Sequence, residues 1–169
     1  MDDHAESPTA LLCFDGSDDA AAAIAAAGRL LGPGRAVVLS VWEPVRVWEP
    51  WDPVTVLSAP LERLVARSTG FDEIVEAIAR DKAGHGVALA RAAGFDAEPR
   101  AVRGGIWETI CRVADELEAE PIVLGSRGVG RARSVLLGSV SQAVIAHTAR
   151  TVLVRGCHPH RAAGAEPAG

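Results

Sequence analysis

Short apolar segments alternate along this chain with longer stretches of helical character, and that alternation constrains the fold more than any other feature. The clearest apolar segment, residues 36–42, reads Ala-Val-Val-Leu-Ser-Val-Trp. Near-continuous apolar character is typical of a central strand in a sheet that helices cover on both faces. Alternation of such strands with helices favours an α/β fold with a parallel sheet.

Five segments are predicted to be strands. They span residues 10–14, 36–42, 98–103, 122–124 and 151–154. A chain of 169 residues suits one compact domain, because two independent cores would each be small. We therefore predict a single α/β domain: an open parallel five-stranded sheet with helices on both faces, joined by right-handed crossovers in a Rossmann-like arrangement.

Four helices are predicted between these strands. The first is rich in alanine, takes Ser17 or Asp18 as its N-cap and ends near Leu31, before Gly32. The other three are defined by apolar residues that recur at helical spacing. They are a region at 61–93 with Ile74, Val75 and Ile78 on one side, an amphipathic helix with Ile106, Ile110, Val113, Ala114 and Leu117, and a last helix marked by Val140, Val144 and His147.

The predicted domain covers residues 8–156. Within it, residues 43–60 hold four prolines and read as a long surface loop. Trp48 and Trp51 in this loop either pack on their own domain or cover a ligand or partner. Residues 1–7 and the Ala/Gly/Pro-rich tail at 157–169 are predicted to be flexible.

Composition excludes several classes of protein. No stretch approaches the roughly 20 apolar residues that cross a bilayer, and the acidic N-terminus is unlike a secretory signal. Three widely spaced cysteines (Cys13, Cys111 and Cys157) do not suit a disulfide framework or a CxxC zinc site. We therefore expect a cytoplasmic protein with no membrane partner.

Charge is unevenly distributed along the chain, whose formal net charge is −5. Residues 1–124 hold 21 acidic and 11 basic side chains, whereas residues 125–155 hold five arginines and no acid. A cationic segment in an acidic protein indicates a local anion site more than a nucleic-acid groove, so no nucleic-acid partner is expected. Arginines scattered over the surface remain an alternative explanation.

Ligands of doubly wound sheets bind beyond the carboxyl ends of the strands, where the winding direction reverses. This rule points to the loops after Phe14, Val41 and Leu124. The last of these loops is rich in glycine and leads through Gly138-Ser139 into the last helix. The free N–H groups and partial positive charge of that helix N-terminus would hold phosphate oxygens, with the hydroxyls of Ser139 and Ser141 as added donors or caps.

The glycine-rich loop matches neither of two common phosphate-binding motifs. A P-loop needs Lys before Ser/Thr, and the one lysine of the chain, Lys82, lies far from this loop in the sequence. The dinucleotide fingerprint needs a glycine where Arg133 stands. The loop instead reads Gly125-x2-Gly128-x9-Gly138-Ser139, and its glycines allow close approach of the backbone to an anion or a positive φ.

With a strand before it and a helix after it, this spacing resembles the nucleotide-binding pattern of the universal stress protein family. The resemblance covers residues 8–156: Asp15-Gly16-Ser17 is similar to the family's first loop, Ser40-Val41 to the end of its second strand, and residues 136–141 and 151–154 to its C-terminal block. Two departures, at Gly104-Gly105 and Glu120-Pro121, lie outside the glycine pattern.

The resemblance implies an adenine nucleotide alpha hydrolase-like fold that binds ATP, with Mg²⁺ held through the phosphates. It implies that Phe14 and Asp15 form the first loop of the site, with the Asp15 carboxylate near the ribose and metal. It also implies that the Val41 backbone contacts the adenine edge. It implies Leu124 and Gly125 beside the ribose. Around the phosphates it implies Gly128, Gly138, Ser139, Val140 and Ser141. It also implies a homodimer in which the strands Thr151–Val154 pair edge to edge.

The residues themselves leave plainer roles open. Asp15 is also a common turn residue after a strand, and Ser139 caps its helix with or without phosphate. His147 is more typical of a packed, hydrogen-bonded histidine than of a base. At least two of the three loop arginines, Arg127, Arg131 and Arg133, are expected to face solvent, since the backbone alone can bind the anion.

We therefore expect an ATP-binding stress-response or regulatory protein that acts as a dimer. Efficient phosphoryl transfer needs metal-holding carboxylates, a positioned nucleophile and usually Lys or Arg on the leaving group. Asp15 is the one carboxylate placed near the phosphates, so no catalytic residue is assigned. The alternatives are a slow ATP-hydrolysing or adenylating enzyme on the same fold, and a structural dimer whose glycine loop is empty.

Overall fold

The computed structural model describes residues 8–43, 69–126 and 137–155. The two predicted flexible ends and, apart from Glu43, the predicted loop at 43–60 lie outside the described residues, as do Trp48 and Trp51.

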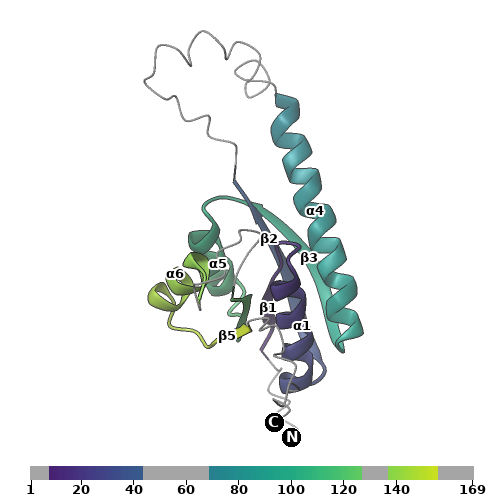
Figure 1. Cartoon of the computed structure of the whole chain (residues 1–169), viewed down its shortest axis with the longest axis vertical. Helices are drawn as coiled ribbons and strands as arrows, with labels where there is room; N and C mark the ends of the chain where they lie inside the picture. Colours follow the sequence, from purple (N-terminus) through teal and green to yellow (C-terminus); the bar gives the residue numbers. More distant parts are fainter. Residues whose placement is uncertain (1–7, 44–68, 127–136, 156–169) are drawn as a thin grey trace, which may run out of the picture.

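Five parallel strands form one sheet in the order β3-β2-β1-β4-β5. The strands are β1 (Ala10–Cys13), β2 (Gly34–Trp42), β3 (Phe95–Arg103), β4 (Ile122–Gly125) and β5 (Val152–Arg155). The helices are α1 (Asp18–Leu31), α4 (Thr69–Ala92), α5 (Ile106–Glu116) and α6 (Ser139–His147). The predicted fold is confirmed, with α1 and α4 on one face of the sheet and α5 and α6 on the other (Figure 1).

The strand boundaries differ from the sequence prediction by up to three residues. The largest difference is in β3, which begins at Phe95 rather than Glu98. Phe95 and Ala97 are buried while Asp96 and Glu98 are exposed, so the first half of this strand alternates between core and solvent. Alternation with charged residues is the pattern of an edge strand with one face exposed. The first three residues of β3 therefore form no continuous apolar segment, and the predicted strand does not include them.

Two layers of core pack against the sheet. Leu12, Ala36 and Val38 face α1 and α4, whereas Leu11 and Leu39 face α5 and α6. Neighbouring residues of a strand point to opposite faces, so a strand buried on both sides must be apolar throughout. This is why β1 and β2 read as continuous apolar segments.

The apolar side predicted for the second helical region is wrong. Ile74 is 58% exposed and Ile78 is 50% exposed, and the residues of α4 that reach the core are instead Ala79, Ala83, Val87 and Ala90. At helical spacing Ile74 and Ile78 lie on the side of α4 opposite these buried residues. Figure 1 shows the N-terminal part of α4 extending past the end of the sheet. No helix within the described residues is both long and apolar enough to span a membrane.

The first helix begins and ends as predicted. Ser17 is the N-cap of α1, and its hydroxyl accepts a hydrogen bond from the Ala20 N–H at 3.2 Å. Gly32 ends the helix with φ +73°, a conformation that favours glycine. Asp18 and Asp19 lie in the first turn, where the helix dipole favours negative charge.

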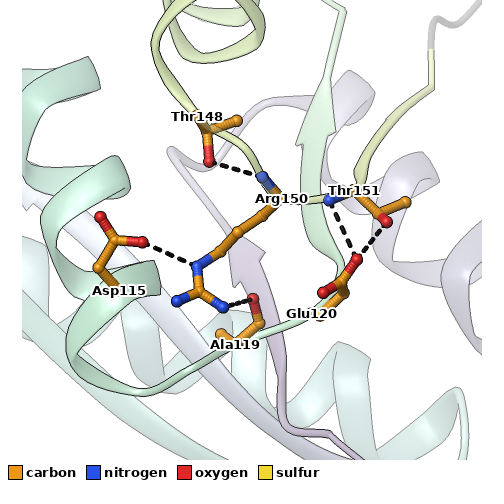
Figure 2. Close-up of polar contacts among 6 residues, drawn as sticks. All are labelled: Asp115, Ala119, Glu120, Thr148, Arg150 and Thr151. Carbon is orange, nitrogen blue, oxygen red and sulfur yellow. Dashed lines mark hydrogen bonds and ion pairs between the residues drawn. The ribbon is translucent and has the colours of Figure 1, made fainter.

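A polar cluster fixes the edge strand β5 at the amino end of β4 (Figure 2). Arg150 donates from Nε to Asp115 at 2.9 Å and from its guanidinium to the Ala119 carbonyl at 3.3 Å. Both the hydroxyl and the N–H of Thr151 donate to one carboxylate oxygen of Glu120. Glu120, which belongs to the departure from the family pattern at Glu120-Pro121, therefore anchors the start of the edge strand.

The same contacts hold the pKa of the Glu120 carboxyl below its usual range, because the Thr151 hydroxyl and then its N–H favour the ionised form. A lowered pKa in the folded state stabilises the fold above the unfolded-state pKa. That stabilisation is lost as the pH falls through the lowered folded-state value.

Gly84 and Gly86 lie two residues apart in α4, and substitution by alanine is predicted to change the unfolding free energy in opposite directions at the two positions. At Gly86 a Cβ would lie 2.7 Å from the Val38 side chain and 3.0 Å from the Phe14 ring, so Gly86→Ala should lower the unfolding free energy by about 1–3 kcal/mol. At Gly84 nothing lies within 4 Å, and Gly84→Ala should raise it by about 0.5–1 kcal/mol through helix propensity. Urea unfolding of both variants measures the difference, and equal effects would contradict the packing argument.

Candidate functional site

The strand order reverses between β1 and β4, because the chain moves outward to β2 and β3 and then returns to the other side of β1. In open α/β sheets the crevice for ligands lies at this point, beyond the carboxyl ends of the strands. The helices that follow these two strands, α1 and α6, begin on opposite faces of the sheet. Their N-termini therefore flank the candidate site.

The first loop holds Asp15 in a turn. Its Oδ1 accepts a hydrogen bond from the Ser17 N–H at 2.9 Å, and Gly16 has φ +89°, which favours glycine. The turn role left open for Asp15 is therefore present. The side chain of Phe14 is 3% exposed, lies in the core beside α4 and meets the His85 ring edge to face at 5.6 Å. Phe14 can offer a ligand its backbone, not its ring.

Gly125 lies at the tightest point of the site. A Cβ at this position would lie 2.8 Å from the Ala20 nitrogen and 2.9 Å from the Asp19 carbonyl carbon. Both atoms belong to the backbone of α1 and cannot move independently of it. Gly125 has no positive φ, so the position requires glycine for space rather than for conformation.

Ser126 and Asp19 form a buried contact that the sequence analysis missed. The Ser126 hydroxyl donates to the Asp19 carboxylate at 3.0 Å, and the two residues are 5% and 9% exposed. The Ser126 carbonyl accepts the N–H of Gly138 at 2.6 Å. Ser126 stands inside the glycine motif and Asp19 inside the helix that follows the first loop, yet no local pattern pairs residues so far apart in sequence.

The first turn of α6 has backbone N–H groups without an intrahelical partner. Its N-cap is Gly138, which supplies no side-chain cap, and not Ser139, whose predicted capping role is wrong. Gly138 has φ −70° and ψ 157°, so the positive φ allowed for this glycine is not used. Ser139 is exposed, Val140 is half-buried, and the Ser141 hydroxyl donates to the Gly125 carbonyl at 2.9 Å. Ser141 thus ties α6 to β4.

The remaining predicted site residues divide between core and undescribed chain. Leu124 is 4% exposed and packs beneath α5 and α6, where half-buried Val41 joins the same cluster. Leu124 and Val41 are each the next-to-last residue of their strand, so their backbones lie at the carboxyl edge of the sheet. Gly128 lies outside the described residues. So do the three loop arginines, Arg127, Arg131 and Arg133.

Lys82 lies much closer to the candidate site than its sequence position suggests. From α4, its Cε lies 3.8 Å and its Cδ 4.0 Å from the place of a Cβ on Gly16. Lys82 is far in sequence from the glycine-rich loop, yet the fold places its side chain beside the first loop. Lys82 and Gly16 are far apart in the sequence, but packing of α4 on the sheet brings Lys82 beside the loop that follows β1.

Cys13, Cys111 and His147 lie on the side of the sheet covered by α5 and α6. Burial raises the pKa of the Cys13 thiol far above its usual range, with Cys111 and Asp15 acting in the same direction, and burial also raises the pKa of Cys111. Both thiols are free. His147 is exposed rather than packed in the core, although its Nδ1 pairs with the Ala143 carbonyl at 2.8 Å and its ring lies 4.3 Å from that of Trp107, centroid to centroid.

Metal-binding side chains do not gather anywhere in the described part of the chain: no three of its His, Cys, Asp or Glu residues form a group that could hold an ion.

The parallel sheet with its reversal at β1 and β4 defines a doubly wound α/β protein whose ligand edge lies between two helix N-termini. The sequence profile of the universal stress protein family matches residues 8–155. The chain belongs to this family. It is 35% identical over 150 residues to a universal stress protein of Thermus aquaticus encoded in the QAH/OAS sulfhydrylase 3′ region, covering 86% of this chain and 96% of that protein.

Solved structures share the fold. Hypothetical protein MJ0577 matches with a TM-score of 0.70 at 20% identity, covering 91% of this chain and 99% of that one. Universal stress protein UspA from Lactobacillus plantarum matches with a TM-score of 0.54 at 26% identity, covering 89% and 99%. The universal stress protein from Archaeoglobus fulgidus in complex with dAMP matches with a TM-score of 0.57 at 20% identity, covering 88% and 96%.

The steric role of Gly125 predicts a loss of stability that does not depend on any ligand. Gly125→Ala should lower the unfolding free energy of the ligand-free protein by about 1–3 kcal/mol, because α1 must shift to admit the methyl group. Gly34→Ala is a matched control, since nothing lies within 4 Å of a Cβ at that strand position. Urea unfolding without nucleotide tests this, and an unchanged midpoint for Gly125→Ala would contradict the close packing.

Proposed function

We propose that this protein is an ATP-binding regulatory protein of the stress response that works as a homodimer. The observation that carries the proposal is the first turn of α6, whose N–H groups have no side-chain cap and begin at the carboxyl edge where the strand order reverses. Such a turn is a favourable place for phosphate oxygens, because its N–H groups and partial positive charge both attract anions.

The ligand lies across the ends of β1 and β4. The backbone N–H groups of Ser139, Val140 and Ser141 hold the phosphates. Gly138, whose own N–H bonds to the Ser126 carbonyl, lets the phosphates approach closely, together with Gly128. Leu124 and Gly125 line the ribose, and the Val41 backbone meets the adenine edge. Asp15 lies beside the ribose and approaches an Mg²⁺ ion that the phosphates carry. These assignments rest on the family pattern and on the positions of the strand ends.

Proteins of the same fold support the choice of an adenine nucleotide. One universal stress protein has been solved in complex with cAMP, and that of Archaeoglobus fulgidus in complex with dAMP. The fold therefore accommodates adenine nucleotides in relatives, and the present chain keeps the complete Gly125-x2-Gly128-x9-Gly138-Ser139 spacing.

Rapid ATP hydrolysis is not part of the proposal. The Asp15 carboxylate already accepts the Ser17 N–H, and the Asp19 carboxylate accepts the Ser126 hydroxyl, so both have structural tasks. Phosphate or AMP release faster than about 1 per second, near the lower end for ordinary enzymes, would favour the alternative of an enzyme on this fold.

The proposed dimer uses the free edge of β5. The Ile122 N–H donates to the Thr151 carbonyl and the Ser126 N–H to the Arg155 carbonyl, each at 2.9 Å. In a parallel pair, alternate residues bond to one neighbour, so Val152 and Val154 direct their backbone groups away from β4. An edge with unpaired N–H and C=O groups is a template for pairing with a second copy of the strand.

The phosphate assignment predicts that Gly138→Val abolishes ATP binding and leaves the protein folded. Its φ of −70° suits any residue, so the expected loss of unfolding free energy is at most about 1 kcal/mol, from a poorer N-cap. The branched side chain would occupy the approach of the phosphates. Calorimetry with ATP and Mg²⁺ should show binding by the natural protein and by the control Gly34→Val, and no binding by Gly138→Val. A natural protein with no affinity for ATP would refute the proposal.

The dimer assignment predicts that Val154→Pro yields a monomer. Proline removes the outward N–H of this residue, and an edge strand tolerates it because that group does not bond to β4. Val154→Thr keeps the N–H and the branched shape and serves as the control. Sedimentation equilibrium should give a dimer for the natural protein and the control. A dimeric Val154→Pro variant would place the interface elsewhere.

A further inference from the structure

We propose that Asp19 and Ser126 are positioning residues of the nucleotide site: their buried hydrogen bond sets the place of the α6 N-terminus, and nucleotide affinity depends on it although neither side chain touches the ligand. The inference rests on the proposed function and deepens it, because it names residues outside the set of glycines and α6 residues assigned to the phosphates.

The contact has the features of a strong polar interaction. The Ser126 hydroxyl lies 3.0 Å from the Asp19 carboxylate, and both residues are at least nine-tenths buried. A hydrogen bond to an ionised acceptor is stronger than one between neutral groups. Away from water, the Ser126 hydroxyl has few alternative partners, so the bond is costly to break.

The backbone of Ser126 carries this constraint to both neighbouring elements. Its N–H donates to Arg155 at the end of β5, and its carbonyl accepts the N–H of Gly138 at 2.6 Å. Gly138 is the N-cap of α6. One residue therefore links α1 through its side chain, and β5 and α6 through its backbone.

Close packing removes the freedom to compensate. Gly125, the residue before Ser126, already lies against the backbone of Asp19 and Ala20. The Ser141 hydroxyl holds the Gly125 carbonyl at 2.9 Å from the α6 side. With Gly125 held in place, the loss of the Asp19 bond is taken up from Ser126 onward, so its carbonyl, the Gly138 N–H bonded to it and the first turn of α6 shift. A misplaced first turn offers its N–H groups to phosphates in the wrong direction.

The experiment compares variants at both ends of the bond. Calorimetry measures the dissociation constant for ATP with Mg²⁺ in the natural protein, Ser126→Ala, Ser126→Thr, Asp19→Ala and the double variant. Ser126→Ala and Asp19→Ala should each weaken binding about tenfold, equivalent to about 1.4 kcal/mol. Ser126→Thr keeps the hydroxyl and should bind within threefold of the natural protein. The double variant should be no weaker than Asp19→Ala, because the Ser126 hydroxyl acts through its bond to Asp19.

A second measurement separates positioning from general loss of stability. Amide hydrogen exchange of Gly138, followed by NMR without nucleotide, should be at least tenfold faster in Ser126→Ala. Thr109→Ala removes another buried hydroxyl, on α5, and should lower stability without changing Gly138 exchange or ATP affinity. Where Ser126→Ala does not fold, Ser126→Cys takes its place, since the thiol fills a similar space but is a poor donor.

The outcomes distinguish this inference from the proposed function. A natural protein that does not bind ATP refutes the proposed function. Unchanged amide exchange of Gly138 in Ser126→Ala would then show separately that Ser126 does not position α6. Binding by the natural protein with dissociation constants within twofold for folded Ser126→Ala and Asp19→Ala overturns the positioning role alone. Additive losses in the double variant would also overturn it.

Discussion

The close approach of α1 to the end of β4 is the constraint on which the rest of the candidate site depends. Backbone of α1 lies so near Gly125 that no side chain fits between them. One residue further, Ser126 bonds to Asp19 of the same helix turn and to the N-cap of α6. Steric contact and hydrogen bonding therefore hold two helix N-termini, on opposite faces of the sheet, in one relative position.

The glycines of the family pattern have different physical causes. Gly125 is required by packing inside the folded protein, whatever binds there. Gly138 has an ordinary backbone conformation, so its dihedral angles do not require glycine, and the proposed approach of phosphates would give it a different cause. A spacing pattern joins these causes in one signature. That is why the match identifies the family well but assigns the role of each glycine poorly.

Most of the fold could be predicted from the sequence, because burial on both faces leaves continuous apolar segments at β1, β2 and β4. The start of β3 could not, since one of its faces meets solvent and its charged residues interrupt the apolar run. In α4 the conspicuous isoleucines are exposed, while alanines, valine and a glycine meet the sheet, because close helix packing selects small residues. The positions of Lys82 and of Asp19 beside Ser126 arise from tertiary packing, and no local pattern records them.

Charge gives the candidate site a direction. The first turn of α1 carries Asp18 and Asp19, and Asp15 precedes it, whereas the first turn of α6 carries no acidic residue. The carboxylates offset the positive end of the α1 dipole, whereas the first turn of α6, as far as the structure describes it, has no acidic side chain to do the same. In the proposed complex with a nucleoside triphosphate, this difference would favour the phosphates toward α6 and the uncharged part toward β1 and β2. The resemblance to the family pattern implies the same orientation.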